Sequence, residues 1–105
     1  NQSSCAAYAI LKSSYAVSKM AISALTVALA SEFAGDNIRV NGIAPGMMTG
    51  RLPDELVAAV LAQQAIQRRG EAEDLVGALL YLCSPASAFM TGQTLIVDGG
   101  ITARP

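Results

Sequence analysis

Two short apolar segments of the chain have the composition of buried strands, and each ends in a turn signal. Residues 38–44 (IRVNGIA) carry β-branched side chains and run into a Pro-Gly pair, whereas residues 95–97 (LIV) precede a Gly-Gly pair. Between them lie two stretches typical of helices, residues 51–66 and 71–84. Strands that alternate with helices predict an α/β fold with a parallel sheet covered by helices on its faces.

The longest run without glycine or proline extends from Tyr15 to about Phe33 and predicts a further helix. Ser13 and Ser14 are suited to cap its start, and Gly35 to cap its end. Apolar residues fall on nearly every side of this helix. It therefore needs cover from its own sheet and from a second layer, for which a partner subunit is the natural source.

The composition argues against several classes of partner. The 105 residues are 52% hydrophobic, with a net charge of −1 and acidic and basic residues scattered along the chain. Without a basic stripe or polybasic patch, we expect neither a nucleic acid nor a membrane surface as partner. The uninterrupted apolar stretches are shorter than the ~20 residues of a membrane span, so we expect core helices. The absence of histidine argues against a transition-metal site.

Cys5 and Cys83 show neither CxxC spacing nor a neighbouring histidine. They are compatible with a disulfide or with two buried free thiols. Free thiols in a reducing compartment are favoured, which predicts a cytoplasmic location.

The segment YAVSK places Tyr15 and Lys19 one turn apart on one face of the first helix. An isolated YxxxK pattern favours a structural interpretation, in which the tyrosine packs at the helix start and the lysine extends to water. The pair also has chemical potential. A free tyrosine has a pKa of about 10, and a nearby ammonium in a partly desolvated pocket favours the phenolate. A hydroxyl from Ser3 or Ser4 would hold a carbonyl beside such a phenol.

Several blocks together are more specific than YxxxK. The chain contains NQSS, YAVSK, IRVNGIAPG and then RRGEAEDLVGALLYLCSPASAFMTGQTLIVDGG, in that order. This series resembles the C-terminal part of the short-chain dehydrogenase/reductase family of NAD(P)-dependent enzymes, across essentially all of residues 1–105. The resemblance implies the C-terminal portion of a single Rossmann-type domain, a doubly wound parallel sheet of which the last two to three strands and their flanking helices are present.

The resemblance also implies roles for the residues around the YAVSK helix. Tyr15 corresponds to the catalytic tyrosine, the general acid in carbonyl reduction and general base in alcohol oxidation. Lys19 corresponds to the lysine that favours the phenolate and hydrogen-bonds the hydroxyls of the nicotinamide ribose. Ser4 corresponds to the serine that polarises the substrate oxygen, with Ser3 as the less favoured alternative.

A loop after the first predicted strand completes the implied site. Pro45 and Gly46 correspond to the turn that lies against the nicotinamide of NAD or NADP. Backbone groups near Met48 would contact the carboxamide, and the hydroxyl of Thr49 would assist. The family commonly has a threonine one position later, where this chain has Gly50.

Two further comparisons with the family pattern matter. Tyr15 follows Ser4 by 11 positions, fewer than the family usually shows, which requires a tighter connection. The family's glycine-rich phosphate turn and catalytic asparagine would precede Asn1, so we expect a C-terminal fragment that would not bind a dinucleotide tightly by itself. The expected activity is oxidation or reduction of a small-molecule alcohol or carbonyl, in a full-length homodimer or homotetramer. The alternative is a non-catalytic truncated module that retains an oligomerisation or ligand-binding surface.

Overall fold

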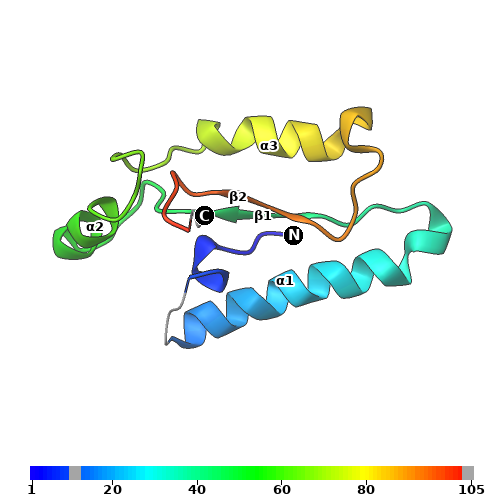
Figure 1. Ribbon diagram of the computed structural model, residues 1–105, viewed down its shortest axis with the longest axis horizontal. Helices are drawn as coiled ribbons and strands as arrows, with labels where there is room; N and C mark the ends of the chain where they lie inside the picture. Colours follow the sequence, from blue (N-terminus) through cyan, green and yellow to red (C-terminus); the bar gives the residue numbers. More distant parts are fainter. Residues whose placement is uncertain (10–12, 103–105) are drawn as a thin grey trace.

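The computed structural model describes residues 1–9 and 13–102 and consists of helices on both sides of a short sheet (Figure 1). The strands lie in a middle layer, with one long helix on one face and a second helix on the other. The elements are, in chain order, η1 (Cys5–Ala7), α1 (Ser14–Glu32), η2 (Ala34–Asp36), β1 (Gly42–Pro45), α2 (Asp54–Leu61), α3 (Glu73–Cys83), η3 (Pro85–Ser87) and β2 (Thr94–Val97), where η denotes a 3₁₀ turn.

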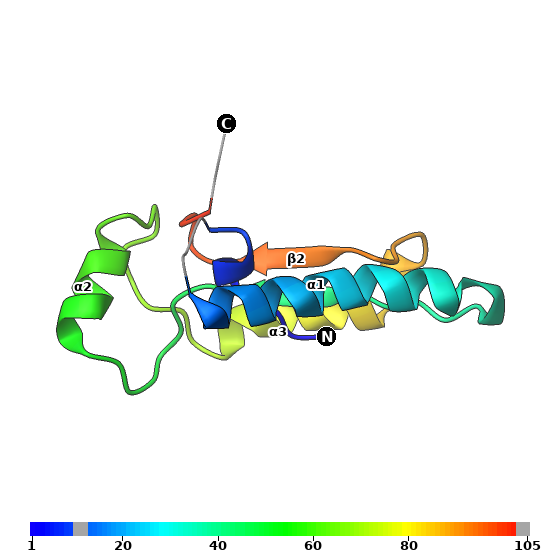
Figure 2. The same ribbon diagram turned by 90° about the horizontal axis from the view of Figure 1, so that it is seen from below.

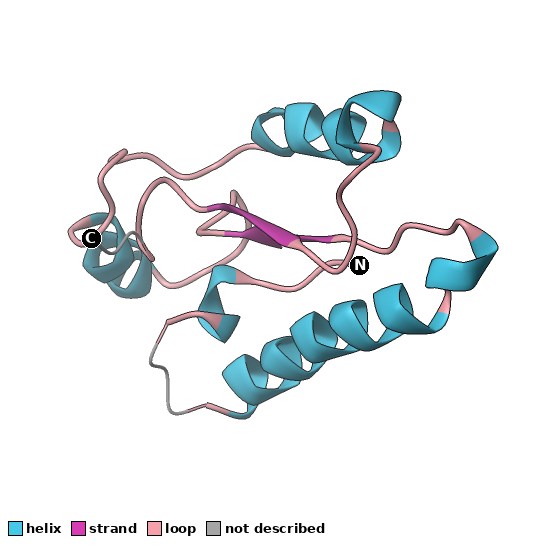
Figure 3. Cartoon of the chain, turned by 45° about the vertical axis from the view of Figure 1, so that its right-hand side comes forward, coloured by secondary structure: helices cyan, strands magenta, loops and turns pink. Residues whose placement is uncertain are grey.

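The sheet is parallel, as the alternation of strands and helices predicted. β1 and β2 pair in parallel, with Gly42 opposite Thr94. On the other side of β1, the N-terminal segment forms a parallel bridge between Gln2 and Ile43 (Figure 3). β1 is therefore the middle of three parallel segments, in agreement with the predicted last two to three strands of a larger sheet.

Several ends of strands and helices lie together at one end of the sheet. In Figure 1 the carboxyl ends of β1 and β2, the amino ends of α1 and α3, and η1 all lie at the left. α2 stands beyond this end, apart from the layers, which the turned view of Figure 2 also shows. In open parallel sheets, ligands bind outside the carboxyl ends of the strands.

α1 forms where predicted, but it ends differently. Ser13 is the N-cap, and its Oγ accepts the N–H of Ala16 at 3.1 Å. The prediction that Gly35 caps the C-terminus is wrong, because Gly35 belongs to η2. The left-handed residue that ends this turn is Asn37, with φ of 59°, a conformation that asparagine tolerates better than most residues.

The predicted strand 38–44 is shorter and shifted, since β1 covers only Gly42–Pro45. The residues before it are held by side chains rather than by a ladder. Arg39 donates to the carbonyls of Leu82 (2.9 Å) and Met90 (3.2 Å), and to Ser87 Oγ (3.0 Å). This guanidinium fastens the approach to β1 to the end of α3.

Of the two helices predicted after β1, the second agrees with the structure better than the first. α2 begins after Pro53 as expected, but ends at Leu61 instead of Ile66. Beyond it the amide of Gln64 donates to the carbonyls of Ile66 and Arg68, which stabilises a turn where helix was predicted. The second helix is confirmed as α3 (Glu73–Cys83) and stops before the Ser-Pro pair.

The buried core is small and made mostly of small side chains. The buried hydrophobic residues are Ala6, Ala16, Ala30, Ile43 and Ala44. α1 leaves much of its apolar surface open, with side chains such as Val17 and Val27 more than half exposed. Such a surface agrees with the prediction of a second covering layer.

Within the described part of the chain, α1 alone has the length and composition to cross a membrane. The complete helix is longer than the apolar stretches that were compared above with the length of a membrane span. A core helix of a soluble protein meets the same criterion, so this is weak evidence for a span. Cys5 and Cys83 are free thiols, as favoured from sequence. The expectation that both thiols are buried is wrong, because Cys83, the last residue of α3, is exposed and Cys5 is only half-buried.

Candidate active site

Tyr15 and Lys19 lie together at the amino end of α1, as their spacing predicted. The Lys19 ammonium nitrogen is 5.6 Å from the centroid of the Tyr15 ring. The tyrosine is 55% exposed, and Lys19 Nζ reaches the Gln2 carbonyl only at 3.5 Å. A phenol and an ammonium thus adjoin on an open surface, where both retain hydrogen-bonding capacity for a ligand.

The two candidate serines have different surroundings. Ser3 Oγ donates to the Lys19 carbonyl at 2.8 Å and lies 2.8 Å from Ser23 Oγ, so its hydroxyl fastens the N-terminal segment to α1. Ser4 is the N-cap of η1, and its Oγ accepts the N–H of Ala6 at 3.2 Å. Accepting a capping bond does not use the proton of a hydroxyl, so Ser4 can still donate.

The turn at Pro45 and Gly46 is built on a close approach between two chain segments. Gly46 donates its N–H to the Val97 carbonyl at 2.9 Å, which extends the pairing of β1 with β2. A Cβ on Gly46 would lie 2.5 Å from Asp98 Cα, closer than real Cβ atoms come. Glycine is therefore required here because no side chain fits between the strand ends.

Beyond this turn, the loop is pinned to the segment that precedes α3. Thr49 donates its N–H to the Gly70 carbonyl and Gly70 its N–H to the Met47 carbonyl, both at 2.8 Å. Thr49 Oγ1 donates to the Gly70 carbonyl at 2.9 Å and also bonds the Glu71 carboxylate. Its hydroxyl thus has a structural role in the loop, beside the cofactor contact predicted for it.

The sequence did not predict that Arg69 has a structural role. Its guanidinium donates to the Met48 carbonyl (2.9 and 3.3 Å) and to the Gly50 carbonyl (2.6 Å). The Arg-Arg pair was the only sequence signal, and a pair of adjacent basic residues is typical of a solvated surface.

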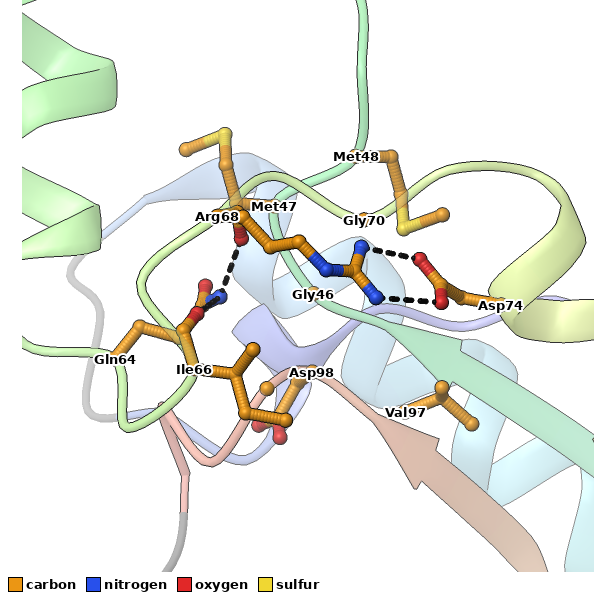
Figure 4. Close-up of a pocket in the computed structure, with 11 residues that line it drawn as sticks. Gly46, Met47, Met48, Gln64, Ile66, Arg68, Gly70, Asp74, Val97 and Asp98 are labelled. Carbon is orange, nitrogen blue, oxygen red and sulfur yellow. Dashed lines mark hydrogen bonds and ion pairs between the residues drawn. The ribbon is translucent and has the colours of Figure 1, made fainter.

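A cavity of about 150 Å³ lies between the ends of β1 and β2 and this loop (Figure 4). It is lined by Gly46, Met47, Met48, Gln64, Ile66, Arg68, Gly70, Asp74, Val97, Asp98 and Gly99. Two of these lining residues, Arg68 and Asp74, form an ion pair through two bonds of 2.7 and 2.8 Å. The hydrogen bond from Arg68 holds the pKa of Asp74 far below its usual range.

The predicted site residues therefore fall into two groups at one end of the sheet. Ser4, Tyr15 and Lys19 gather around η1 and the start of α1, whereas Gly46 and Met48 line the cavity.

Asp98 lies at the same end of the sheet. It packs against Gly46, and its charge also acts on Cys5, next to Ser4. The pKa of the Cys5 thiol is raised, first by burial and further by Asp98. Among residues 1–9 and 13–102, no cluster of histidine, cysteine or acidic side chains suits a metal ion.

Comparison with known proteins relates this arrangement to a family. A family model described as Enoyl-(Acyl carrier protein) reductase matches residues 1–102. The 3-oxoacyl-(acyl-carrier-protein) reductase FabG of Chlamydia pneumoniae is 45% identical over an alignment of 95 residues that covers 87% of this chain and 38% of that protein. A 3alpha-hydroxysteroid dehydrogenase of Mediterraneibacter gnavus is 42% identical over 89 residues, 81% of this chain and 36% of that protein.

Solved structures agree with these sequence matches. A short chain dehydrogenase from Leptospira borgpetersenii with bound NAD+ superposes with a TM-score of 0.90 at 32% identity, covering 97% of this chain and 43% of that one. A 4-hydroxyisoleucine dehydrogenase complexed with NADH and succinate gives a TM-score of 0.88 at 34% identity, covering 99% and 45%.

The parallel strands, their flanking helices and the site at the strand ends define the class, a Rossmann-type α/β protein. Within that class, the chain belongs to the short-chain dehydrogenase/reductase family. It spans less than two fifths of the length of the FabG reductase and the hydroxysteroid dehydrogenase named above.

Proposed function

We propose that the chain forms the proton-transfer end of an NAD(P)(H)-dependent oxidoreductase that reduces a carbonyl or oxidises a secondary alcohol. The observation that carries the proposal is the Tyr15–Lys19 pair, with its ammonium 5.6 Å from the phenol ring at the carboxyl end of a parallel sheet. The relatives support it, since their names are those of reductases and dehydrogenases.

The residues present fit a nicotinamide nucleotide. Neighbouring structures contain NAD+ or NADH. Here the exposed Tyr15 hydroxyl and the Lys19 ammonium offer a donor set suited to the ribose hydroxyls. The Pro45–Gly46 turn brings bare backbone to the strand ends, where Met48 and Thr49 would hold the carboxamide. When bound, NAD(H) or NADP(H) would supply or accept the hydride.

Side chains of this chain would carry out the proton transfer. During reduction, Tyr15 Oη gives its proton to the carbonyl oxygen, and during oxidation it takes the alcohol proton back. The positive charge of Lys19 stabilises the phenolate left after donation. Ser4 donates a hydrogen bond to the substrate oxygen, which stabilises the charge that develops there.

The remaining parts of the proposal concern the intact protein. We propose that residues 1–105 are the C-terminal part of one Rossmann-type domain whose glycine-rich phosphate turn lies elsewhere in the protein. The protein would act in the cytoplasm on a small molecule as a homodimer or homotetramer. The exposed apolar side chains of α1 supply a surface that such an assembly would cover.

The test compares Tyr15→Phe with the parent in the intact oxidoreductase, using Tyr81→Phe as the matched control on the exposed side of α3. Dinucleotide binding is measured by calorimetry and turnover by NAD(P)H absorbance on a panel of ketones. We expect Tyr15→Phe to lose about 10²- to 10⁴-fold in kcat, the usual contribution of a general acid, with binding retained.

Equal carbonyl reduction by Tyr15→Phe would refute the assigned mechanism. If the parent itself bound a dinucleotide but reduced none of the ketones, the alternative of a non-catalytic module would be favoured instead.

A further inference from the structure

The loop between β1 and α2, residues 46–53, contains no helix or strand, and the Arg69 side chain holds it in place together with the hydrogen bonds of Thr49 and Gly70. Arg69 makes three hydrogen bonds to it, two to the Met48 carbonyl and one to the Gly50 carbonyl. Hydrogen bonds from a charged donor are the strong ones, and a guanidinium holds its N–H groups in a rigid plane. The loop conformation therefore depends on a residue about twenty positions downstream.

The peptide groups of Met48 have a defined direction. The bridge between Met48 and Gly70 is made by the neighbours of Met48, through Thr49 N–H and Met47 C=O. In an extended pair, the residue between two such bonds turns its own N–H and C=O to the opposite side. The Met48 groups thus point away from Gly70, and Arg69 holds the carbonyl in that direction.

We propose that Arg69 is a positioning residue that orients the Met48 backbone for recognition of the nicotinamide carboxamide, an inference that rests on the function proposed above. A carboxamide presents a donor and an acceptor. Of the two Arg69 bonds to the Met48 oxygen, the one of 3.3 Å is long and weak, so this oxygen can still accept from the carboxamide, and the Met48 N–H can donate to it. Gly50 has no side chain that would contribute, so the loop recognises this group through backbone whose direction Arg69 sets.

The adjacent arginine provides a matched control. Arg68 carries the same charge, but its guanidinium bonds the Asp74 carboxylate and the Arg69 carbonyl rather than the loop. Arg68→Leu therefore removes a charge and an ion pair close to the cavity without removing a bond to Met48 or Gly50.

The experiment uses the intact oxidoreductase and two reduced cofactors, NADH and its 3-acetylpyridine analogue, which keeps the ring carbonyl but lacks the amide donor. Dissociation constants of the parent, Arg69→Leu, Arg69→Lys and Arg68→Leu are measured by calorimetry. We expect the parent to prefer NADH, and Arg69→Leu to weaken NADH binding about tenfold, as the loss of one net hydrogen bond does. Analogue binding should change little, Arg69→Lys should restore part of the preference, and Arg68→Leu should keep it.

A second measurement needs no cofactor. Amide hydrogen exchange at Thr49 and Gly70 should become faster in Arg69→Leu and Arg69→Lys than in Arg68→Leu, because the loop loses its clamp. An unchanged NADH preference, or equal weakening of both cofactors by Arg69→Leu and Arg68→Leu, would overturn the inference. Failure of the proposed function would give different results. Either the parent would bind no dinucleotide, or Tyr15→Phe would reduce ketones as well as the parent does.

Discussion

Replacement of Gly46 by alanine tests how the strand ends position the candidate site. A Cβ there would lie 2.5 Å from Asp98 Cα, 2.8 Å from Asp98 Cβ and 2.9 Å from the Asp98 carbonyl oxygen. Gly46 does not have a positive φ, so alanine meets no backbone strain of its own. The cost is therefore steric, and because two of the three atoms are main chain, no rotamer change of Asp98 relieves it.

The expected loss of stability is that of an overpacked site, about 1–3 kcal/mol. With a urea m-value of about 2 kcal/mol/M, this lowers the unfolding midpoint by about 0.5–1.5 M. The Gly46 N–H also bonds the Val97 carbonyl at 2.9 Å, so a shift of this turn separates the ends of β1 and β2. We expect weaker dinucleotide binding as well as lower stability.

Gly77 provides the control for this substitution. It lies within α3, and a Cβ there meets nothing within 4 Å. Gly77→Ala should stabilise the protein by about 0.5–1 kcal/mol, the usual gain of alanine over glycine in a helix interior. The reasoning fails if Gly46→Ala unfolds at the parent's urea midpoint, because the close approach of Gly46 and Asp98 would then be absent.

Three more predictions concern residues outside the proposed reaction. Arg39→Met should lower the free energy of unfolding by about 2–3 kcal/mol, since it leaves several acceptors without their charged donor; calorimetric unfolding measures this. The hydrogen bond from Arg68 lowers the pKa of Asp74 in the folded state. The Arg68–Asp74 pair therefore stabilises the folded protein fully above the unfolded-state pKa of about 4, and this stabilisation is lost as the pH falls below that pKa. The difference in urea midpoint between the parent and Arg68→Leu should therefore be larger at pH 7 than at pH 2.5. Exposed Cys83 should react with iodoacetamide before Cys5, whose thiol has a raised pKa, as mass spectrometry of a time course would show.

The elements that the sequence predicted well are those with strong local signals. α1 has a serine N-cap and 19 residues without glycine or proline, and α3 stops before Pro85. β2 combines β-branched residues with a Gly-Gly turn whose glycines both have positive φ. In each case the residues that decide the boundary lie within a few positions of it.

The boundaries that differed are decided by distant side chains. β1 begins four residues later than predicted because Arg39 and Asn41 bond groups near residue 90 instead of continuing a ladder. α2 ends early because the Gln64 amide captures two carbonyls of the following turn. Side chains that compete for backbone groups in this way leave no periodic pattern in the sequence.

In the candidate site, too, local features were predictable and those that depend on distant residues were not. Tyr15 and Lys19 were predictable because helical geometry fixes their distance from a spacing of four. The loop at Met48 was not, because its position depends on Arg69, Gly70 and Glu71, which reach it only after the chain has passed through α2. Thr49 illustrates the difference, since its hydroxyl bonds the Gly70 carbonyl and the Glu71 carboxylate in addition to any role toward a cofactor.

Asp98 fixes the turn after β2 beside the loop that leads to Met48. Its carboxylate accepts the N–H groups of Gly100 and Thr102 at 2.9 Å and the Thr102 hydroxyl at 2.6 Å, which fixes the turn after β2. Its main chain packs against Gly46, where the loop to Met48 begins, and its charge acts on Cys5 beside Ser4. The turn after β2 is thus fixed beside the loop that leads to Met48, whereas no direct hydrogen bond joins this loop to Ser4, Tyr15 or Lys19 among the residues that the structure describes.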